Sequence, residues 1–138
     1  MNTKIINKKI VNQSIVKQEL PKPIELPEMP DIISGVTYKV QGQEHATYVT
    51  INHTEKDGKL VPFQVFINSK DPKLASPIQI IGRLVSALLR VNSSIPFIVE
   101  ELKAVHEPSG GYWCKGTFHV SFAAHIGHIL EKRYKELN

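Results

Sequence analysis

The sequence has a single cysteine, Cys114, in 138 residues. One thiol excludes an intramolecular disulfide, a metal site made of several thiolates, and redox chemistry by a thiol pair within the chain. It is also typical of proteins from a reducing compartment, so we expect a cytoplasmic location. A catalytic thiol would need a nearby imidazole such as His106 or His119, whereas a free cysteine usually behaves as a small hydrophobic residue. We therefore predict that Cys114 is buried and inert.

Long apolar runs are missing as well. No stretch reaches the roughly 18 uninterrupted apolar residues that a membrane-spanning helix needs, and the N-terminus lacks the apolar run and cleavage site of a signal peptide. Hydrophobic residues make up 41% and charged residues 22% of the chain, as in ordinary soluble proteins. The length allows one domain with one core, so we expect a soluble protein with no membrane contact.

Acidic residues are absent from the first 17 positions, which contain four lysines: Lys4, Lys8, Lys9 and Lys17. The net charge of +4 therefore belongs to this segment, because the remaining 121 residues carry 13 charges of each sign. Nucleic-acid binding favours a basic face interleaved with aromatic residues, and a neutral body with a basic tail is not that pattern. We expect a solvated tail and no binding of nucleic acid.

Residues 1–30 are predicted to form an arm in front of a domain that spans residues 31–138. Four of the nine prolines fall close together and hold the chain extended: Pro21, Pro23, Pro27 and Pro30. Before them, apolar residues recur every four to five positions: Ile5, Ile6, Ile10, Val11, Ile15 and Val16. They favour either a short helical stripe or an added strand that needs a partner surface, or else a frayed terminus.

From Gly35 onward, apolar and polar residues alternate as they do in β-strands. Three strands are predicted, over residues 36–40, 46–52 and 62–68. A turn at Lys56–Lys59 joins the last two, and Pro62 stands at the start of the third, where a missing donor is tolerated. Three helices are predicted to follow. The first runs from an N-cap at Ser76 through Val91, the second from Pro96 to before Pro108, and the third over residues 121–137. The fold class is α+β, with a small antiparallel sheet of about three strands packed with about three helices behind a proline-rich arm.

The first of these helices is apolar on more than one side: Ile78, Ile80, Ile81, Leu84, Val85, Ala87, Leu88, Leu89 and Val91. One three-stranded sheet cannot cover all of this surface, so a second layer is expected. Closed two-fold symmetry is the commonest way to supply it, and we predict a homo-oligomer, most simply a dimer. The guanidinium groups of Arg83 and Arg90 on the same helix must contact water or an anion, because burying an unpaired charge is costly.

Six separated blocks of the chain keep the order and approximate spacing of a known family: residues 35–40, 48–52, 62–70, 82–87, 99–105 and 110–113. Together they resemble the TSCPD domain, which occurs near the C-terminus of adenosylcobalamin-dependent (class II) ribonucleotide reductases and in small stand-alone proteins. Many members have one cysteine just before the last helix and another before a proline in the loop after the second helix. Phe122 and Glu107 stand at these positions here. A metal or redox role attached to those cysteines is therefore not expected of this chain.

Ribonucleotide reduction as this family performs it needs a thiyl radical and a second pair of thiols in one barrel, and this chain has one cysteine and no room for that barrel. The resemblance therefore implies a non-catalytic accessory or binding module that needs no cofactor and contacts nucleotides or a larger, reductase-like protein. The alternative is a stand-alone oligomeric protein that binds or sequesters a small phosphorylated nucleotide ligand. A hydrolase that uses the histidines is a third interpretation.

Five residues are candidates for binding an anion or a nucleotide: Lys70, Arg83, Gly110, Gly111 and Trp113. Bare backbone in the glycine loop can approach a phosphate, a guanidinium offers two parallel hydrogen bonds, and an indole can stack on a base. In the alternative interpretation the glycines form a turn, Trp113 anchors the core and Arg83 is a surface charge.

His125, His128 and Glu131 follow one another at a spacing of three, so a helix would place them on about one face, where His119 could join them. Such a face could bind Zn²⁺. The paired ligand signatures of zinc sites are missing, however, so we predict no metal and interpret at least one of His125 and His128 as a hydrogen-bonded interface residue.

Overall fold

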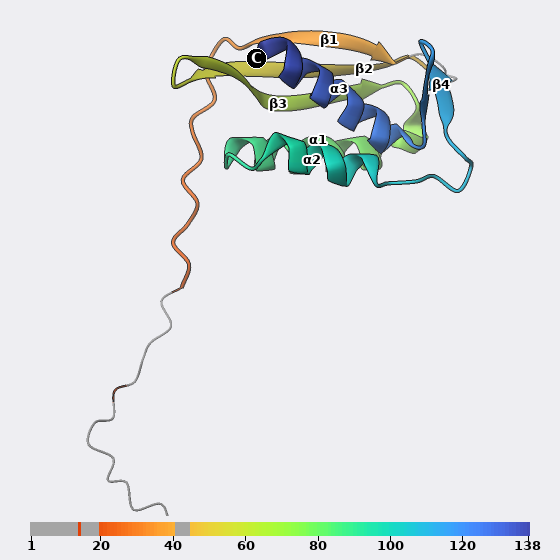
Figure 1. The fold of residues 1–138 in the computed structure, drawn as a ribbon. Helices are drawn as coiled ribbons and strands as arrows, with labels where there is room; N and C mark the ends of the chain where they lie inside the picture. Colours follow the sequence, from red (N-terminus) through yellow and green to blue (C-terminus); the bar gives the residue numbers. More distant parts are fainter. Residues whose placement is uncertain (1–13, 15–19, 41–44) are drawn as a thin grey trace, which may run out of the picture.

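The computed structural model describes residue 14, residues 20–40 and residues 45–138. In this part of the chain, a three-stranded antiparallel sheet of strand order β1–β2–β3 packs with three helices, which confirms the predicted α+β class (Figure 1). A separate hairpin of two short strands, β4 (Tyr112–Cys114) and β5 (Thr117–His119), lies at one end of the domain. The sheet strands are β1 (Ser34–Val40), β2 (Thr47–Lys56) and β3 (Lys59–Ser69), and the helices are α1 (Ala75–Arg90), α2 (Ile95–Lys103) and α3 (Phe122–Leu137).

The predicted turn between β2 and β3 is confirmed. Asp57 and Gly58 have φ values of 51° and 79°, and two positive φ angles give a two-residue turn whose twist matches the strands it joins. The strands are longer than predicted, so Pro62 lies inside β3 rather than at its start. Pro62 pairs with His53, directly beside the point where the register of the two strands shifts. A bulge of this kind tolerates a residue that has no N–H to donate.

The prediction of Ser76 as the N-cap of α1 is wrong. The helix begins at Ala75, and Leu74 occupies the cap position without a side-chain hydrogen bond. The reason lies just upstream, where Asp71 caps a single 3₁₀ turn and accepts a hydrogen bond of 3.0 Å from the backbone N of Lys73. The chain is therefore already helical before it reaches Ser76.

One core joins the inner face of the sheet to α3. The alternating strand residues Val49, Ile51 and Val65 face Ile126 and Leu130, which have 0% exposure. These are the residues that the two-residue period of the strands and the 3.6-residue period of the helix place inward. Helix α2 packs beneath α3, on the side away from the sheet.

Small residues bring α2 close to α3 and α1 close to the edge of β3. A Cβ at Gly127 would lie 3.0 Å from Leu102 of α2, so the two helices touch there. On α1, Ser86 Oγ accepts a hydrogen bond of 3.0 Å from Val65 N and donates one of 3.1 Å to Val65 O. One hydroxyl thus satisfies both backbone groups that β3 presents at that edge position. Helix α1 closes this edge, and β1 forms the opposite edge of the sheet.

The described part of the arm, residues 20–30, has neither helix nor strand. Its contact with the domain includes a hydrogen bond of 3.1 Å from Arg90 Nη2 to Pro27 O. The predicted apolar stripe of residues 5–16 lies outside the described residues. Within the described ranges, no helix combines the length and the apolar character that crossing a membrane requires.

Candidate functional site

The hairpin of β4 (Tyr112–Cys114) and β5 (Thr117–His119) was not predicted from the sequence. Lys115 and Gly116 join the two strands with φ values of 48° and 80°, which is again the two-residue turn of a tight hairpin. Strands of three residues are too short to show a period of two. The signal that could have found them is the Lys115–Gly116 pair between two aromatic residues, because such turn residues often mark hairpins.

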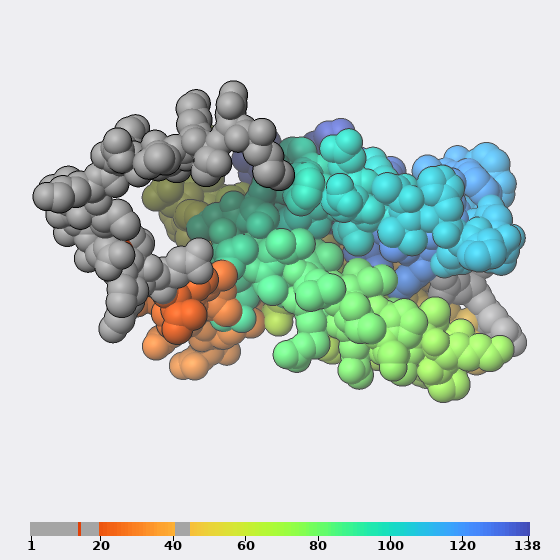
Figure 2. All heavy atoms as spheres, turned by 90° about the horizontal axis from the view of Figure 1, so that it is seen from below, coloured from red at the N-terminus to blue at the C-terminus, as the bar shows by residue number. Residues whose placement is uncertain are grey.

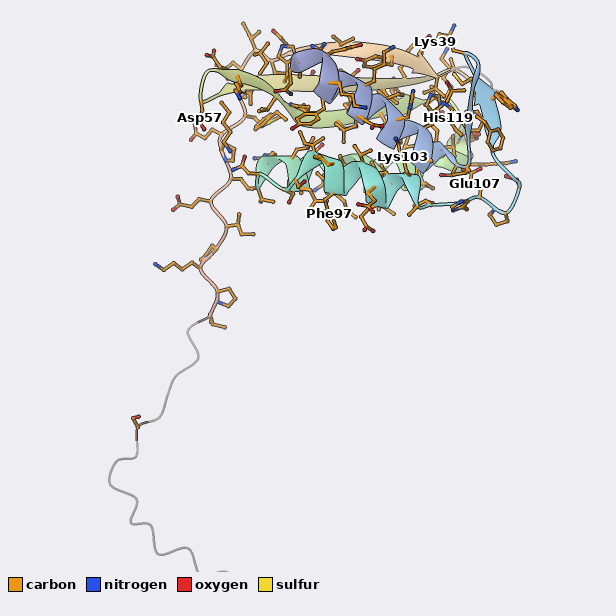
Figure 3. All side chains as sticks on the ribbon, in the orientation of Figure 1. Lys39, Asp57, Phe97, Lys103, Glu107 and His119 are labelled. Carbon is orange, nitrogen blue, oxygen red and sulfur yellow. The ribbon has the colours of Figure 1, made fainter. Side chains whose placement is uncertain are left out.

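The hairpin brings His119 of β5 against His125 and His128 on the first turns of α3. The rings of His119 and His125 are stacked, with centroids 3.8 Å apart and planes 7° from parallel. His128 meets His119 edge-on, with its centroid 5.3 Å away. The hydroxyl of Tyr112 forms a hydrogen bond of 2.7 Å with His125 Nδ1. Figure 3 shows His119 beside the start of α3, where the hairpin meets the helix.

Burial keeps these histidines neutral at physiological pH. Burial, the largest cause, and the neighbouring charges of His119, His128 and Lys115 together lower the pKa of His125 to about 4. The pKa values of His119 and His128 are also lowered, first by burial and then by nearby positive charge, which for both includes Lys103. A neutral pair can stack, whereas two imidazolium rings at this distance would repel each other.

The helical spacing of His125, His128 and Glu131 does not produce a ligand set. No group of three or more His, Cys, Asp or Glu side chains in the described residues is arranged to hold a metal ion. His125 Nδ1 is engaged by Tyr112, and Glu131 is paired with two lysines of α2 and α3. His125 is a hydrogen-bonded interface residue between the hairpin and α3, as predicted of at least one of the two helical histidines.

Cys114 is buried, as predicted, on the inner side of β4. The two positions that the family resemblance aligns with cysteines are in contact. Glu107 Oε1 accepts a hydrogen bond of 3.1 Å from the backbone N of Phe122, the first residue of α3. A carboxylate is favourable at a helix N-terminus, where backbone N–H groups lack partners. A charge–helix contact therefore occupies the place where many relatives have thiols.

The five anion candidates lie in three parts of the fold: on α1, at the hairpin and after β3. Arg83 lies on α1 and lines a groove between α1 and β3, and none of the other four candidates lines that groove. Gly110 and Gly111 precede β4 with φ values of 94° and 83°, and Gly111 packs directly against the backbone of β5. Trp113 is 67% exposed on β4 and contacts the ring of Phe118, so it is not a core anchor. Lys70 follows the end of β3 and is exposed.

Arg90 is a groove residue that was not among the candidates. It lines the same groove as Arg83, two helical turns further along α1. The spacing of seven residues is a sequence signal that could have paired the two arginines, because residues seven apart share one side of a helix.

A second surface feature is an apolar patch on the outer sides of α1 and α2, which we call the α1–α2 face: Ile80 (57% exposed), Leu84 (61%), Leu88 (38%), Val91 (38%) and Phe97 (55%). Figure 2 views the domain from this side, where α1 in green and α2 in teal lie next to each other. Phe97 is on the outer side of α2, away from the sheet (Figure 3). The predicted second apolar side of α1 is therefore present, and no described residue covers it.

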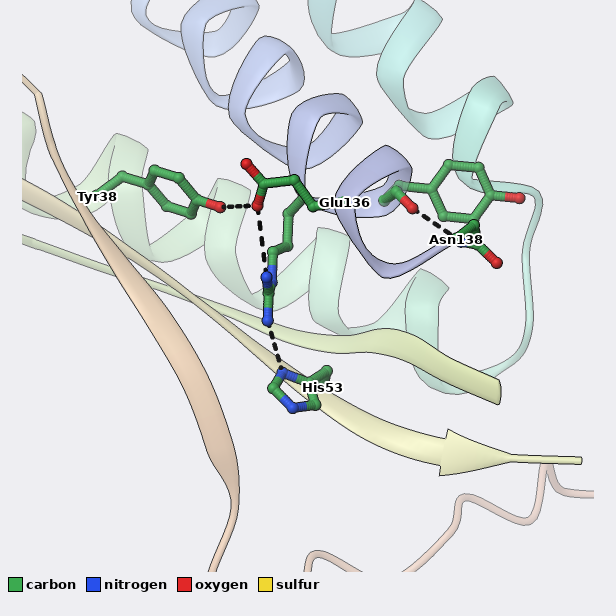
Figure 4. Close-up of polar contacts among 6 residues, drawn as sticks. Tyr38, His53, Glu136 and Asn138 are labelled. Carbon is green, nitrogen blue, oxygen red and sulfur yellow. Dashed lines mark hydrogen bonds and ion pairs between the residues drawn. The ribbon is translucent and has the colours of Figure 1, made fainter. Parts of the chain in front are cut away.

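A polar network ties the last turns of α3 to the sheet (Figure 4). Tyr38 Oη of β1 donates to Glu136 Oε2 over 3.2 Å, and Arg133 pairs with the same carboxylate at 3.4 Å. Arg133 Nη2 also lies 3.2 Å from His53 Nδ1 of β2. Burial and the charge of Glu136 raise the pKa of Tyr38, so its phenol stays protonated. This network holds the last turns of α3 against the sheet, at the end of α3 opposite to the hairpin.

Comparison with known proteins gives one match. No curated protein and no solved structure matches the chain significantly. The family model of the TSCPD domain matches residues 22–134, which include all five strands, α1, α2 and most of α3. Because the match spans most of the chain and its whole core, the chain belongs to the TSCPD domain family.

Proposed function

We propose that this chain is a non-catalytic binding module that acts by protein contact, and that its contact surface is the α1–α2 face. The observation that carries the proposal is the row of five large apolar side chains, each between 38% and 61% exposed, on the side of the helices opposite the core. Soluble monomers rarely expose contiguous apolar patches of this kind without a use for them.

A second copy of the chain is the partner that we propose for this face. Covering a leucine, isoleucine or phenylalanine completely is worth about 1.5 to 3 kcal/mol, so even partial coverage of five such side chains is a substantial driving force. A two-fold axis lets one patch cover an identical patch, and dimers of this symmetry are the commonest assemblies. A larger protein, such as a reductase-like partner, is the alternative occupant.

A non-catalytic role is supported by the thiol count. The reductases that carry this domain use several cysteines together, whereas this chain has one, Cys114, which is buried in the hairpin. The lone thiol also agrees with a reducing, cytoplasmic environment.

Sedimentation velocity of the full chain over a wide range of concentration tests the proposal. We expect a dimer for the native sequence and a monomer for Ile80→Glu, because each copy would bury an unpaired carboxylate in the interface. Val105→Glu is the matched control, since Val105 is 47% exposed but lies beyond the end of α2. It should remain dimeric. A native chain that is monomeric throughout would exclude self-association, and a dimer that survives Ile80→Glu would place the interface elsewhere.

A further inference from the structure

The groove between β3 and α1 has the size of a small-molecule site. Its volume is about 690 Å³, within the range of roughly 300 to 1,000 Å³ that is usual for such sites. The groove exists because α1 presents small residues here: Gly82, Ser86 and Ala87 line it between bulkier neighbours. The hydroxyl of Ser86 is already paired with β3, so the middle of the groove offers a ligand little polar contact.

Two guanidinium groups supply the charged contacts. Arg83 and Arg90 both line the groove, and no aspartate or glutamate among the described residues lines it. The three ion pairs among the described residues lie on α2 and α3 and involve neither arginine. Arg90 donates to the carbonyl of Pro27, while its Nε is buried without a hydrogen-bond partner in the described structure. Arginine cannot shed its proton, so both groups stay positively charged, and no acidic side chain in the described part of the chain pairs with either of them.

Size and charge together identify the class of ligand. Seven residues of helix separate the two arginines by about 10 Å along the axis, which is the span of a small organic molecule rather than of an inorganic ion. Two positive charges with no acidic partner among the described residues match a phosphoryl group, which carries about two negative charges near neutral pH, better than they match one carboxylate. Phe66, 58% exposed at the rim, presents an aromatic ring on which a flat base can stack.

The geometry points to a binding site for a phosphorylated compound with a flat ring, such as a nucleotide, in the groove between β3 and α1. Arg83 and Arg90 lie two helical turns apart and contact different phosphoryl oxygens of the ligand, Phe66 stacks on the ring, and Leu26 of the arm borders the site. Of the five residues that the sequence put forward for an anion, only Arg83 belongs to this groove. The groove is lined by residues of one copy of the chain and shares only Leu84 with the α1–α2 face, so its arginines do not depend on the proposed dimer.

Calorimetric titration of the full chain with ADP, pyrophosphate and adenosine tests this site. We expect ADP to bind, and Arg83→Gln and Arg90→Gln each to weaken it about tenfold or more, because each removes a charge-assisted hydrogen bond. Phe66→Ala should weaken ADP about tenfold and leave pyrophosphate unchanged, since only ADP has a ring. Lys59→Gln, at the exposed turn between β2 and β3, is the matched loss of one positive charge and should bind like the native chain.

Several results would overturn the site. These are no heat with ADP or pyrophosphate, equal losses in Arg83→Gln and Lys59→Gln, or adenosine that binds as tightly as ADP. Arg90 also contacts the arm. If circular dichroism shows that Arg90→Gln is unfolded, the affinity of Arg83→Gln for ADP tests the site, because Arg83 is exposed. Ile80→Glu, which does not line the groove, should bind ADP like the native chain even as a monomer. That variant separates failure of this site from failure of the proposed dimer.

Discussion

Lowering the pH should destabilise the fold through the histidines between the hairpin and α3. The folded pKa of His125 is about 4, against an ordinary value of 6.5 that applies in the unfolded chain. At pH values between these two pKa values, His125 is protonated in the unfolded chain but not in the folded chain. The free energy of unfolding therefore falls as the pH drops below 6.5, and this effect levels off below pH 4.

The size of the effect follows from the shift. A difference of about 2.5 pKa units corresponds to about 3 kcal/mol of stability, lost across that window. His125 is only 5% exposed, so solvent does not screen this loss. The pKa values of His119 and His128 are lowered too, and their contributions have the same sign. Charging one ring also makes the next one harder to charge, because the rings of His119 and His125 are stacked at 3.8 Å.

Carboxylates act in a lower window. Lys103 and Lys135 hold the pKa of Glu131 below its ordinary value of 4.5, so the stability that this carboxylate gives is lost only as the pH falls through and below that value. The histidines are therefore the groups that dominate between pH 6.5 and about 4.5.

Urea denaturation followed by circular dichroism at a series of pH values measures this slope. His125→Asn is the informative variant, because asparagine keeps a polar atom for Tyr112 but has no proton to gain. We expect the native chain to lose about 3 kcal/mol or more from pH 7 to pH 4.5 and the variant to lose clearly less. Identical slopes in the two proteins would show that the histidine stack does not govern acid stability.

Three further changes test how backbone and side chain are matched. Gly111→Ala should lower the free energy of unfolding by more than about 3 kcal/mol, because φ is positive and the added Cβ would lie 2.2 Å from a carbonyl oxygen of β5. Gly110→Ala has open space around the added Cβ and should lower it by only about 1 kcal/mol. Thermal melts of the two variants should differ accordingly. Ser86→Ala should cost about 1 to 3 kcal/mol in urea denaturation, because it leaves an N–H and a C=O of β3 unsatisfied under α1. Glu107→Gln should lower the free energy of unfolding by about 0.5 to 1 kcal/mol and so lower the melting temperature slightly, since the amide keeps the hydrogen bond to α3 and loses only the charge. An unchanged melting temperature would mean that the charge of Glu107 does not stabilise the N-terminus of α3.

The sheet and α3 were predictable because their signals are local. Val49 and Ile51 alternate with polar residues, and Ile126 and Leu130 repeat at helical spacing, so each element can be recognised within its own segment. The Asp57–Gly58 turn is equally local. The start of α1 was missed because the residue that organises it is Asp71, which caps a different turn upstream.

The sites depend on contacts between segments, and the sequence indicates those only weakly. Helical spacing put His125 and His128 on one face but could not show that His119 stacks on the first of them from a hairpin that was itself not predicted. The groove depends on how closely α1 approaches β3, which is set by the size of Ser86 and Gly82. The placing of Lys70 in an anion site stays a prediction.

The polar network at the end of α3 and the core beneath it can form only late in synthesis, because both need α3. The inner residues of the sheet, such as Val65 and Ile67, share one core with Ile126 and Leu130 of α3, which are made roughly sixty residues later. At the usual rates of translation this interval lasts about 3 to 12 s. During that time the ribosome-bound chain can form its β2–β3 hairpin, but the part of its apolar face that α3 covers stays exposed to water. Tyr38 and Glu136, 98 residues apart in the sequence, can meet only after α3 has been made.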